Sequence, residues 1–187
     1  MKQRVRTITV FGSSRPAESD HDYMVARQLG SELAKKGFSI CNGGYGGVME
    51  AVSRGANDAG GRAIGITTRF FEADANHWLA KEIRVKTWQD RLFELIDRGD
   101  GYVVCPGGTG TLVELSVAWE MMNQNVMAKK PVIVLGEFWK PVIDRIRKAD
   151  CTQDSAGMEK QNAFIRFAES APEAADMLAV YFKSQAR

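Results

Sequence analysis

Short hydrophobic runs alternate with stretches of helical periodicity along almost the whole chain. The runs are rich in β-branched residues and are bounded by Gly, Ser or Pro, a pattern typical of strands. The predicted strands cover residues 8–11, 38–41, 63–67, 83–85, 102–105 and 131–135. Most of them lack polar alternation, which indicates strands that are buried on both faces.

Between these runs, hydrophobic residues recur at the three- or four-residue spacing of an α-helix face. Val25, Leu29 and Leu33 predict a first helix from about Asp20, which ends near Gly37. Further helices are predicted from residue 48 to 59, from 88 to 99, from 112 onward and from 138 to 149. Residues 150–161 are polar and predict a surface loop.

A last helix is predicted after Ser170, which can cap it, with Pro172 in its first turn. Its spacing makes Met177, Val180 and Tyr181 the predicted packing residues. No repeat, low-complexity tract or linker divides the chain, so residues 1–187 are expected to form a single domain.

Alternating strands and helices predict an α/β fold, a Rossmann-like three-layer sandwich with a mainly parallel sheet and helices on both faces. In such sheets ligands bind beyond the carboxyl ends of the strands. Three loops rich in glycine or hydroxyl residues are predicted there, at 12–16, 42–47 and 106–111. This shared position is the first indication of a binding site.

The composition favours no macromolecular partner. With 44% hydrophobic and 26% charged residues and a net charge of +2, neither a nucleic acid nor a membrane is expected to bind. No apolar stretch approaches the ~20 residues of a membrane span. The three cysteines include no C-x-x-C pair, and His21 and His77 lack metal or triad spacing. We therefore expect a cytoplasmic protein with reduced thiols and no metal.

The loop at 106–111 has the chemistry of a phosphate site. Gly107, Gly108 and Gly110 would let backbone N–H groups converge on an anion at a helix N-terminus, and the hydroxyls of Thr109 and Thr111 could complete its hydrogen bonds. The alternative is a tight turn without a ligand. The loop is not a P-loop, because no Lys precedes Thr111, and it lacks the third glycine of a dinucleotide fingerprint.

Two charged residues outside this loop are candidates for chemistry. Glu114 follows Gly110 by four residues, about 6 Å along a helix. A carboxylate there could stabilise an oxocarbenium-like ribose or orient a water molecule, although acidic residues are also favoured near helix starts for electrostatic reasons. Arg91 lies at the edge of an apolar helix stripe, where its guanidinium needs an acceptor. A phosphate or purine nitrogen would serve, as would a neighbouring carboxylate or solvent.

The segment Pro106-Gly107-Gly108-Thr109-Gly110-Thr111 with Glu114 resembles the P-G-G-x-G-T-x-x-E signature of the LONELY GUY family, the cytokinin riboside 5′-monophosphate phosphoribohydrolases. The resemblance runs from Gly12 to Val132 and includes a second glycine loop that begins at Gly43. It implies that Arg91 and Glu114 cleave the N-glycosidic bond of a nucleotide, with no cofactor, in a homodimer or higher homo-oligomer.

The chain also departs from this pattern. Leu92 and Val113 stand where the family usually has Lys and Glu, so the resemblance does not specify the base. The expected substrate is an AMP-like or cytokinin riboside monophosphate, hydrolysed to free base and ribose 5-phosphate. The alternative is a non-catalytic nucleotide or molybdenum-cofactor carrier; such carriers are similar in fold and typically have Gly where this chain has Pro106. Retention of Arg91 and Glu114 together favours the enzyme.

The candidate substrate-binding residues come from all three loops and from the helix that follows the second one. They are Ser13, Ser14, Gly44, Gly46, Gly47, Glu50, Gly107, Gly108, Thr109, Gly110 and Thr111.

Overall fold

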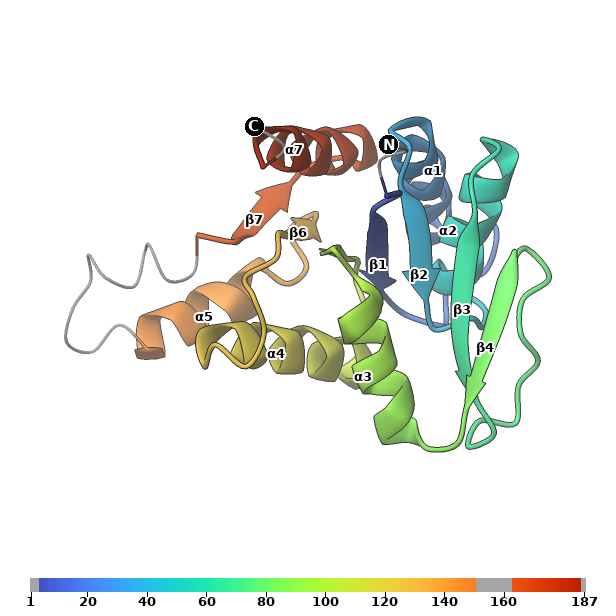
Figure 1. Cartoon of the computed structure of the whole chain (residues 1–187), viewed down its shortest axis with the longest axis horizontal. Coiled ribbons are helices and arrows are strands. Elements are labelled where there is room, and N and C mark those ends of the chain that lie inside the picture. Colours follow the sequence, from blue (N-terminus) through green and yellow to red (C-terminus); the bar gives the residue numbers. More distant parts are fainter. Residues whose placement is uncertain (1–3, 151–162, 186–187) are drawn as a thin grey trace.

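The described residues form one parallel sheet covered by helices. The structure is a computed structural model that describes residues 4–150 and 163–185. The sheet has seven strands in the order β4-β3-β2-β1-β5-β6-β7, and every neighbouring pair is parallel (Figure 1). The α/β class and the Rossmann-like three-layer arrangement are confirmed.

The elements follow one another as strand and helix except at β3 and β4, which are joined by a loop. The strands are β1 (Thr7–Phe11), β2 (Ser39–Asn42), β3 (Ala63–Thr68), β4 (Lys81–Val85), β5 (Gly101–Val104), β6 (Val132–Leu135) and β7 (Ile165–Ala168). The helices are α1 (His21–Lys35), α2 (Val48–Asp58), α3 (Trp88–Arg98), α4 (Thr109–Asn123), α5 (Lys140–Asp150) and α7 (Ala171–Ser184).

Each face of the sheet has its own hydrophobic core. Side chains at alternate positions of a strand point to opposite faces, so Ile8 and Val10 of β1 contact one core and Phe11 the other. The first core contains buried residues of α1, α2 and α7, and the second contains buried residues of α3, α4 and α5. Helices therefore cover both faces, as Figure 1 shows.

Most of the predicted elements are present, with two differences. The strand β7 was not predicted, and it extends the sheet beyond β6. The last helix begins after Ser170, whose side chain accepts a hydrogen bond from the backbone N–H of Glu173, but Val180 is 65% exposed and does not pack. The helix contacts α1 through the other side, where Ala174 and Leu178 are buried. The loop predicted for residues 150–161 lies almost entirely outside the described residues.

The strand order places a crevice between β1 and β5. The chain adds β2, β3 and β4 on one side of β1 and then returns to add β5, β6 and β7 on the other side. The loops after β1 and β5 therefore lead to helices on opposite faces, and their divergence opens the sheet edge where α/β proteins bind ligands. Within the described part of the chain, no helix is long and apolar enough to cross a membrane.

Candidate active site

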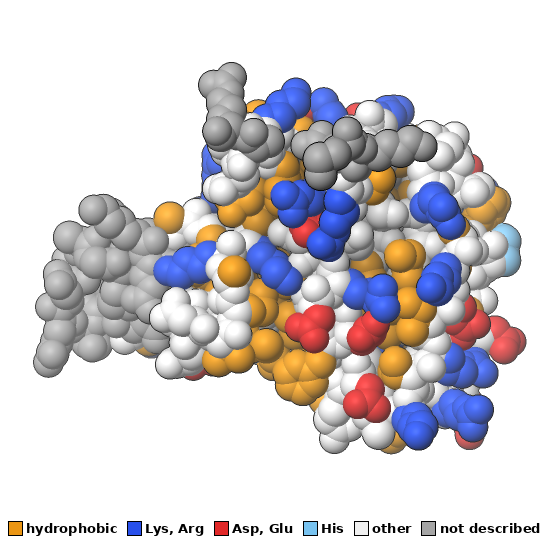
Figure 2. All heavy atoms as spheres, in the orientation of Figure 1, with side chains coloured by type: hydrophobic (Ala, Val, Ile, Leu, Met, Phe, Trp, Pro, Cys, Tyr) orange, Lys and Arg blue, Asp and Glu red, His pale blue; other side chains and the backbone are white. Residues whose placement is uncertain are grey.

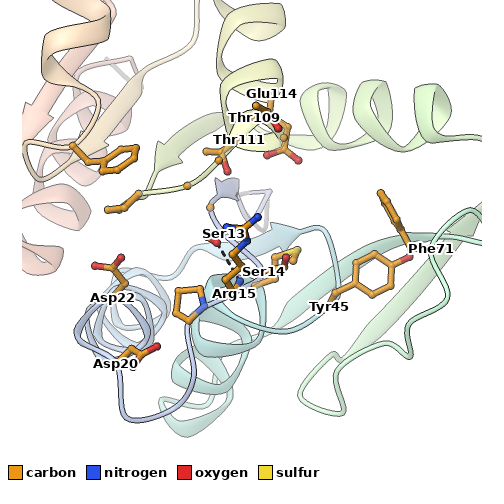
Figure 3. A pocket seen from close by; sticks show the side chains of 18 of the residues that line it. Ser13, Ser14, Arg15, Asp20, Asp22, Tyr45, Phe71, Thr109, Thr111 and Glu114 are labelled. Carbon is orange, nitrogen blue, oxygen red and sulfur yellow. Dashed lines mark hydrogen bonds between the residues drawn. The ribbon is translucent and has the colours of Figure 1, made fainter.

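A pocket of about 880 Å³ lies over this crevice. Its walls come from the loop after β1, the loop after β2, the start of α4 and the segment that follows β3. Figure 3 shows Thr109, Thr111 and Glu114 on α4 forming one wall, with Tyr45 and Phe71 at one end and Asp20 and Asp22 at the other. The volume suits a nucleotide-sized ligand, since small-molecule pockets commonly enclose about 300–1,000 Å³.

Ser13 connects the two glycine-rich segments. Its backbone N–H donates to the carbonyl of Pro106 at 3.2 Å, and its own carbonyl accepts from the N–H of Val48 at 2.8 Å. Its hydroxyl accepts from the backbone N–H of Arg15 at 3.1 Å, which shapes the turn after β1. Ser13 and Ser14 both line the pocket.

The predicted phosphate loop is shorter than the sequence indicated, because α4 begins at Thr109. Thr109, Gly110 and Thr111 therefore form the first turn of the helix, and their N–H groups lie at its electropositive end. Gly108 and Gly110 are exposed and line the pocket, and a Cβ built on either would meet nothing within 4 Å. Neither has a positive φ. The fold does not require glycine at these two positions, and the backbone there is open to the pocket.

Arg91 reaches the pocket from α3 and is only 8% exposed. Its Nε donates to the carbonyl of Ile66 at 2.9 Å, and its Nη2 donates to the carbonyl of Gly43 at 3.1 Å. These bonds fix the plane of the guanidinium, and its Nη1 lies 3.9 Å from Oε1 of Glu114. Burial lowers the pKa of Arg91, and the nearby Glu114 carboxylate partly offsets this.

Glu114 completes this pair from the second turn of α4. Burial raises the pKa of its carboxyl from the ordinary 4.5 to about 7, although the Arg91 guanidinium acts in the opposite direction. A carboxyl with such a pKa can hold or release a proton near neutral pH, a property frequent among catalytic groups. Arg91 and Glu114 are 23 residues apart in the sequence and lie on different helices, so the fold brings them together.

The second glycine loop does not line the pocket with its glycines. A Cβ on Gly43 would lie 1.7 Å from Nη2 of Arg91, so glycine there makes room for the guanidinium. Gly44 packs against Thr67, and Gly47 packs against Ser13 and Ser14. The remaining candidates, Gly46 and Glu50, are also absent from the pocket lining, and Glu50 accepts a hydrogen bond from the hydroxyl of Tyr23 at 3.1 Å.

The sequence did not single out several side chains that line the pocket. From the second glycine loop and the start of α2, these are Tyr45 and Met49 rather than the glycines. Arg15 and Pro16 come from the predicted loop at 12–16, and the others lie in segments without a recognisable motif: Asp20, Asp22, Phe71, Ala73 and Phe138. Hydrophobicity alone did not mark Phe71, because exposed aromatic residues also occur elsewhere in the chain.

Comparisons with known proteins identify related sequences. An uncharacterised protein of Archaeoglobus fulgidus is 30% identical over 71% of this chain and 86% of its own length. A cytokinin riboside 5′-monophosphate phosphoribohydrolase of Mycobacterium tuberculosis is 30% identical over 60% of this chain and 62% of its own. A probable cytokinin riboside 5′-monophosphate phosphoribohydrolase of Oryza sativa subsp. japonica is 30% identical over 70% of this chain and 58% of its own length. The chain thus spans about three fifths of these two phosphoribohydrolases.

A solved structure with the same fold is the molybdenum cofactor binding protein of Rippkaea orientalis. It is 26% identical, with a TM-score of 0.76 over 97% of this chain and 99% of the other. The family profile described as the SLOG cluster4 family matches residues 5–165. The resemblance to the LONELY GUY phosphoribohydrolases is thereby confirmed, and the chain belongs to the SLOG cluster4 family.

Proposed function

We propose that the protein is a nucleoside 5′-monophosphate phosphoribohydrolase. The observation that carries the proposal is the Arg91–Glu114 pair, which is largely buried in the pocket and lies one helical turn beyond the open glycines of α4. An anion site followed by a buried carboxyl matches the phosphate and the ribose of a nucleotide. Relatives named as phosphoribohydrolases support the same reaction class.

The reaction breaks the bond between C1′ of ribose and a nitrogen of the base. The electron pair of this bond leaves with the base, a water oxygen bonds to C1′, and the proton released by the water is taken up by the base. Glu114 in its ionised form stabilises the positive charge that develops on the ribose, and Arg91 stabilises the negative charge on the departing base. The phosphate bound at Gly108–Thr111 anchors the substrate and does not react.

The test is base release from a panel of nucleoside 5′-monophosphates, followed by chromatography. Glu114→Gln keeps the shape but removes the charge, so we expect kcat to fall at least ~100-fold while nucleotide binding changes little. Glu120→Gln is the matched control, because Glu120 is exposed on the same helix and lies outside the pocket. Unchanged base release from Glu114→Gln would refute the role of Glu114.

Arg91 is tested in the same assay. We expect Arg91→Ala to reduce turnover, because the departing base loses its nearby cation. Arg98→Ala is its control, since Arg98 also lies on α3 but pairs with Glu94, with 2.6 Å between its Nε and the Glu94 carboxylate. Equal losses in both variants would show that the effect comes from α3 stability and not from the site.

A carrier of a nucleotide or of molybdenum cofactor is the second candidate function. The observation that favours it is the 26% identity to the Rippkaea orientalis protein over nearly the whole of both chains. A carrier would bind its ligand in the same pocket without cleaving it. Absence of base release by the parent protein, together with nucleotide binding that Glu114→Gln alters only through affinity, would favour this function.

We further propose that the protein assembles at least as a dimer through the face that carries α3 and α4. Hydrophobic side chains come to the surface over these helices (Figure 2). Val113, Val117 and Met121 of α4 are only partly buried, and Phe93 of α3 is exposed. A helix with apolar residues on all sides requires cover on its outer side as well. A monomer mass by light scattering would contradict this proposal.

A further inference from the structure

The pocket has an end that the anion site and the Arg91–Glu114 pair do not use. Beyond Arg91 lie the rings of Tyr45 and Phe71, each with its centroid 5.5 Å from Cζ of Arg91. The order along the pocket is therefore the start of α4, then Glu114 with Arg91, then two aromatic rings (Figure 3). A nucleoside monophosphate has the same order, with phosphate, ribose and base.

Tyr45 is held firmly in this position. Its hydroxyl accepts a hydrogen bond from the backbone N–H of Thr68 at 2.9 Å and donates to the Thr68 carbonyl at 3.0 Å. Its ring meets that of Phe71 edge to face, with the centroids 5.6 Å apart and an interplanar angle of 86°. This is a favourable arrangement for two aromatic rings, so Tyr45 fixes one side of Phe71.

The segment that carries Phe71 is tied to the second glycine loop. Downstream of Phe71, the backbone N–H of Asn76 donates to the carbonyl of Gly44 at 2.8 Å, and its side-chain amide donates to the carbonyl of Tyr45 at 3.0 Å. With Tyr45 bonded to Thr68, residues 69–75 are fastened at both ends. Phe71 lines the pocket from this segment and is nevertheless 37% exposed. A flat apolar group placed against this ring would remove its exposed surface from water.

We propose that Phe71, supported by Tyr45, stacks on the base of the nucleotide and is the residue through which the pocket distinguishes bases by the size of their π-face. The inference rests on the proposed function, because it assumes that the phosphate binds at the start of α4. A purine offers the larger π-face, and the Arg91 guanidinium lies beside the same rings, where it can reach a ring nitrogen of the base. The opposite end presents the carboxylates of Asp20 and Asp22, which offer no such surface.

The test uses nucleotides that water cannot cleave, so that it reads binding alone. Formycin 5′-monophosphate and pseudouridine 5′-monophosphate carry a purine-like and a pyrimidine base, respectively, on a carbon–carbon bond. We expect the parent to bind the first more tightly by calorimetry. Phe71→Ala should weaken binding of formycin 5′-monophosphate about 10-fold, in line with stacking on one aromatic ring, and should leave ribose 5-phosphate binding unchanged.

Glu72→Ala is the matched control, because Glu72 is the adjacent residue, is exposed and lies outside the pocket lining. Phe71→Trp should restore tight binding, since it restores an aromatic face. The proposal is overturned if Phe71→Ala binds formycin 5′-monophosphate as the parent does, or if it weakens ribose 5-phosphate equally. It is also overturned if Asp22→Asn, and not Phe71→Ala, weakens the purine analogue.

Failure of this inference and failure of the proposed function give different results. If the parent releases base and Phe71→Ala binds formycin 5′-monophosphate as tightly as the parent, hydrolysis is supported and the stacking role is refuted. The expected binding pattern without base release from any monophosphate would refute hydrolysis and support the stacking role.

Discussion

The loop at residues 43–47 and the start of α4 are both rich in glycine, yet Gly43 and Gly44 have surroundings opposite to those of Gly108 and Gly110. A Cβ on Gly43 would overlap the Arg91 guanidinium, and one on Gly44 would approach Thr67 to 2.7 Å. A Cβ on Gly108 or Gly110 would meet nothing. At Gly43 and Gly44 the space beside the backbone is thus filled by the protein itself, whereas at Gly108 and Gly110 the start of α4 leaves space at a helix N-terminus.

This difference shows why glycine content alone does not identify a binding surface. At Gly43 glycine is needed so that Arg91 can approach the backbone, which is a requirement of the folded chain. At Gly108, the N-cap, and at Gly110, in the first turn of α4, the folded chain has no such requirement, and at Gly110 the helix would be more stable with Ala. Substitutions in the two segments are therefore expected to have different consequences.

The largest effect is expected for Gly108→Val. The valine side chain would occupy the space where the phosphate approaches the N–H groups of α4, and the loss of two charge-assisted hydrogen bonds weakens binding at least ~100-fold. The fold should lose only about 1 kcal/mol, because Val is a poor residue at a helix N-cap. Calorimetry with AMP and thermal unfolding measure the two quantities. Ser116→Val, exposed on the same helix and outside the pocket, should bind AMP normally.

The next largest effect is expected in the pH dependence of stability and comes from Glu114. This residue lies on α4, and its partner Arg91 is bonded to the second glycine loop. The pKa of Glu114 is raised from 4.5 to about 7 in the folded protein, so the folded state binds the proton more tightly than the unfolded state. Its contribution to stability is therefore present below pH 4.5 and is lost as the pH rises to about 7. At about 1.4 kcal/mol per pKa unit, the loss is at most about 3.5 kcal/mol.

Denaturant unfolding of the parent and of Glu114→Gln over this pH range measures the difference. Glu114→Gln should lack the decline and should be the more stable protein above pH 7. Glu120→Gln should decline as the parent does. Parallel pH profiles of the parent and Glu114→Gln would contradict the raised pKa.

Gly43→Ala should have a smaller effect on stability and a clear one on catalysis. The new Cβ displaces Nη2 of Arg91 and breaks its bond to the Gly43 carbonyl, which costs about 2 kcal/mol. Base release should fall as it does in Arg91→Ala. Gly46→Ala is the control for stability in the same loop, because its Cβ would have no neighbour closer than 3.9 Å. An equal loss of stability in both variants would remove the distinction between these positions.

The smallest effect is expected for Gly110→Ala, and it has the opposite sign. Ala in the first turn of α4 should stabilise the fold by about 0.5–1 kcal/mol. The added methyl group should at the same time weaken AMP binding, because it projects into the open space of the pocket. Thermal unfolding and calorimetry on one sample measure both. A gain in stability without a change in affinity would place the phosphate elsewhere.

The layered fold could be predicted from the sequence because its buried strands are short apolar runs between glycines. The strand β7 was missed for a physical reason, since it has only four residues at the edge of the sheet and includes the exposed Arg166. Val180 was assigned to the wrong face of α7, because alanines, which carry little hydrophobic signal, make the contact with α1.

At the site, the sequence indicated the residue types at the start of α4 and left the acceptors of Arg91 open. These acceptors are the backbone carbonyls of Ile66 and Gly43, which no pattern of side chains can reveal. Phe71 likewise could not be predicted from the sequence, because its place in the pocket follows from the hydrogen bonds of Tyr45 and Asn76 and not from a local motif.

The hydrogen bonds that fasten the segment from 69 to 75 also have an evolutionary consequence. They anchor it through Thr68 and Asn76, at either end of the segment, so the residues between can change while the start of α4 and the carbonyls that hold Arg91 stay in place. On the proposed assignment, anchoring and chemistry are separated from recognition of the base. One scaffold can then accept a new ligand through substitutions at a few exposed positions, while the residues assigned to the reaction stay unchanged.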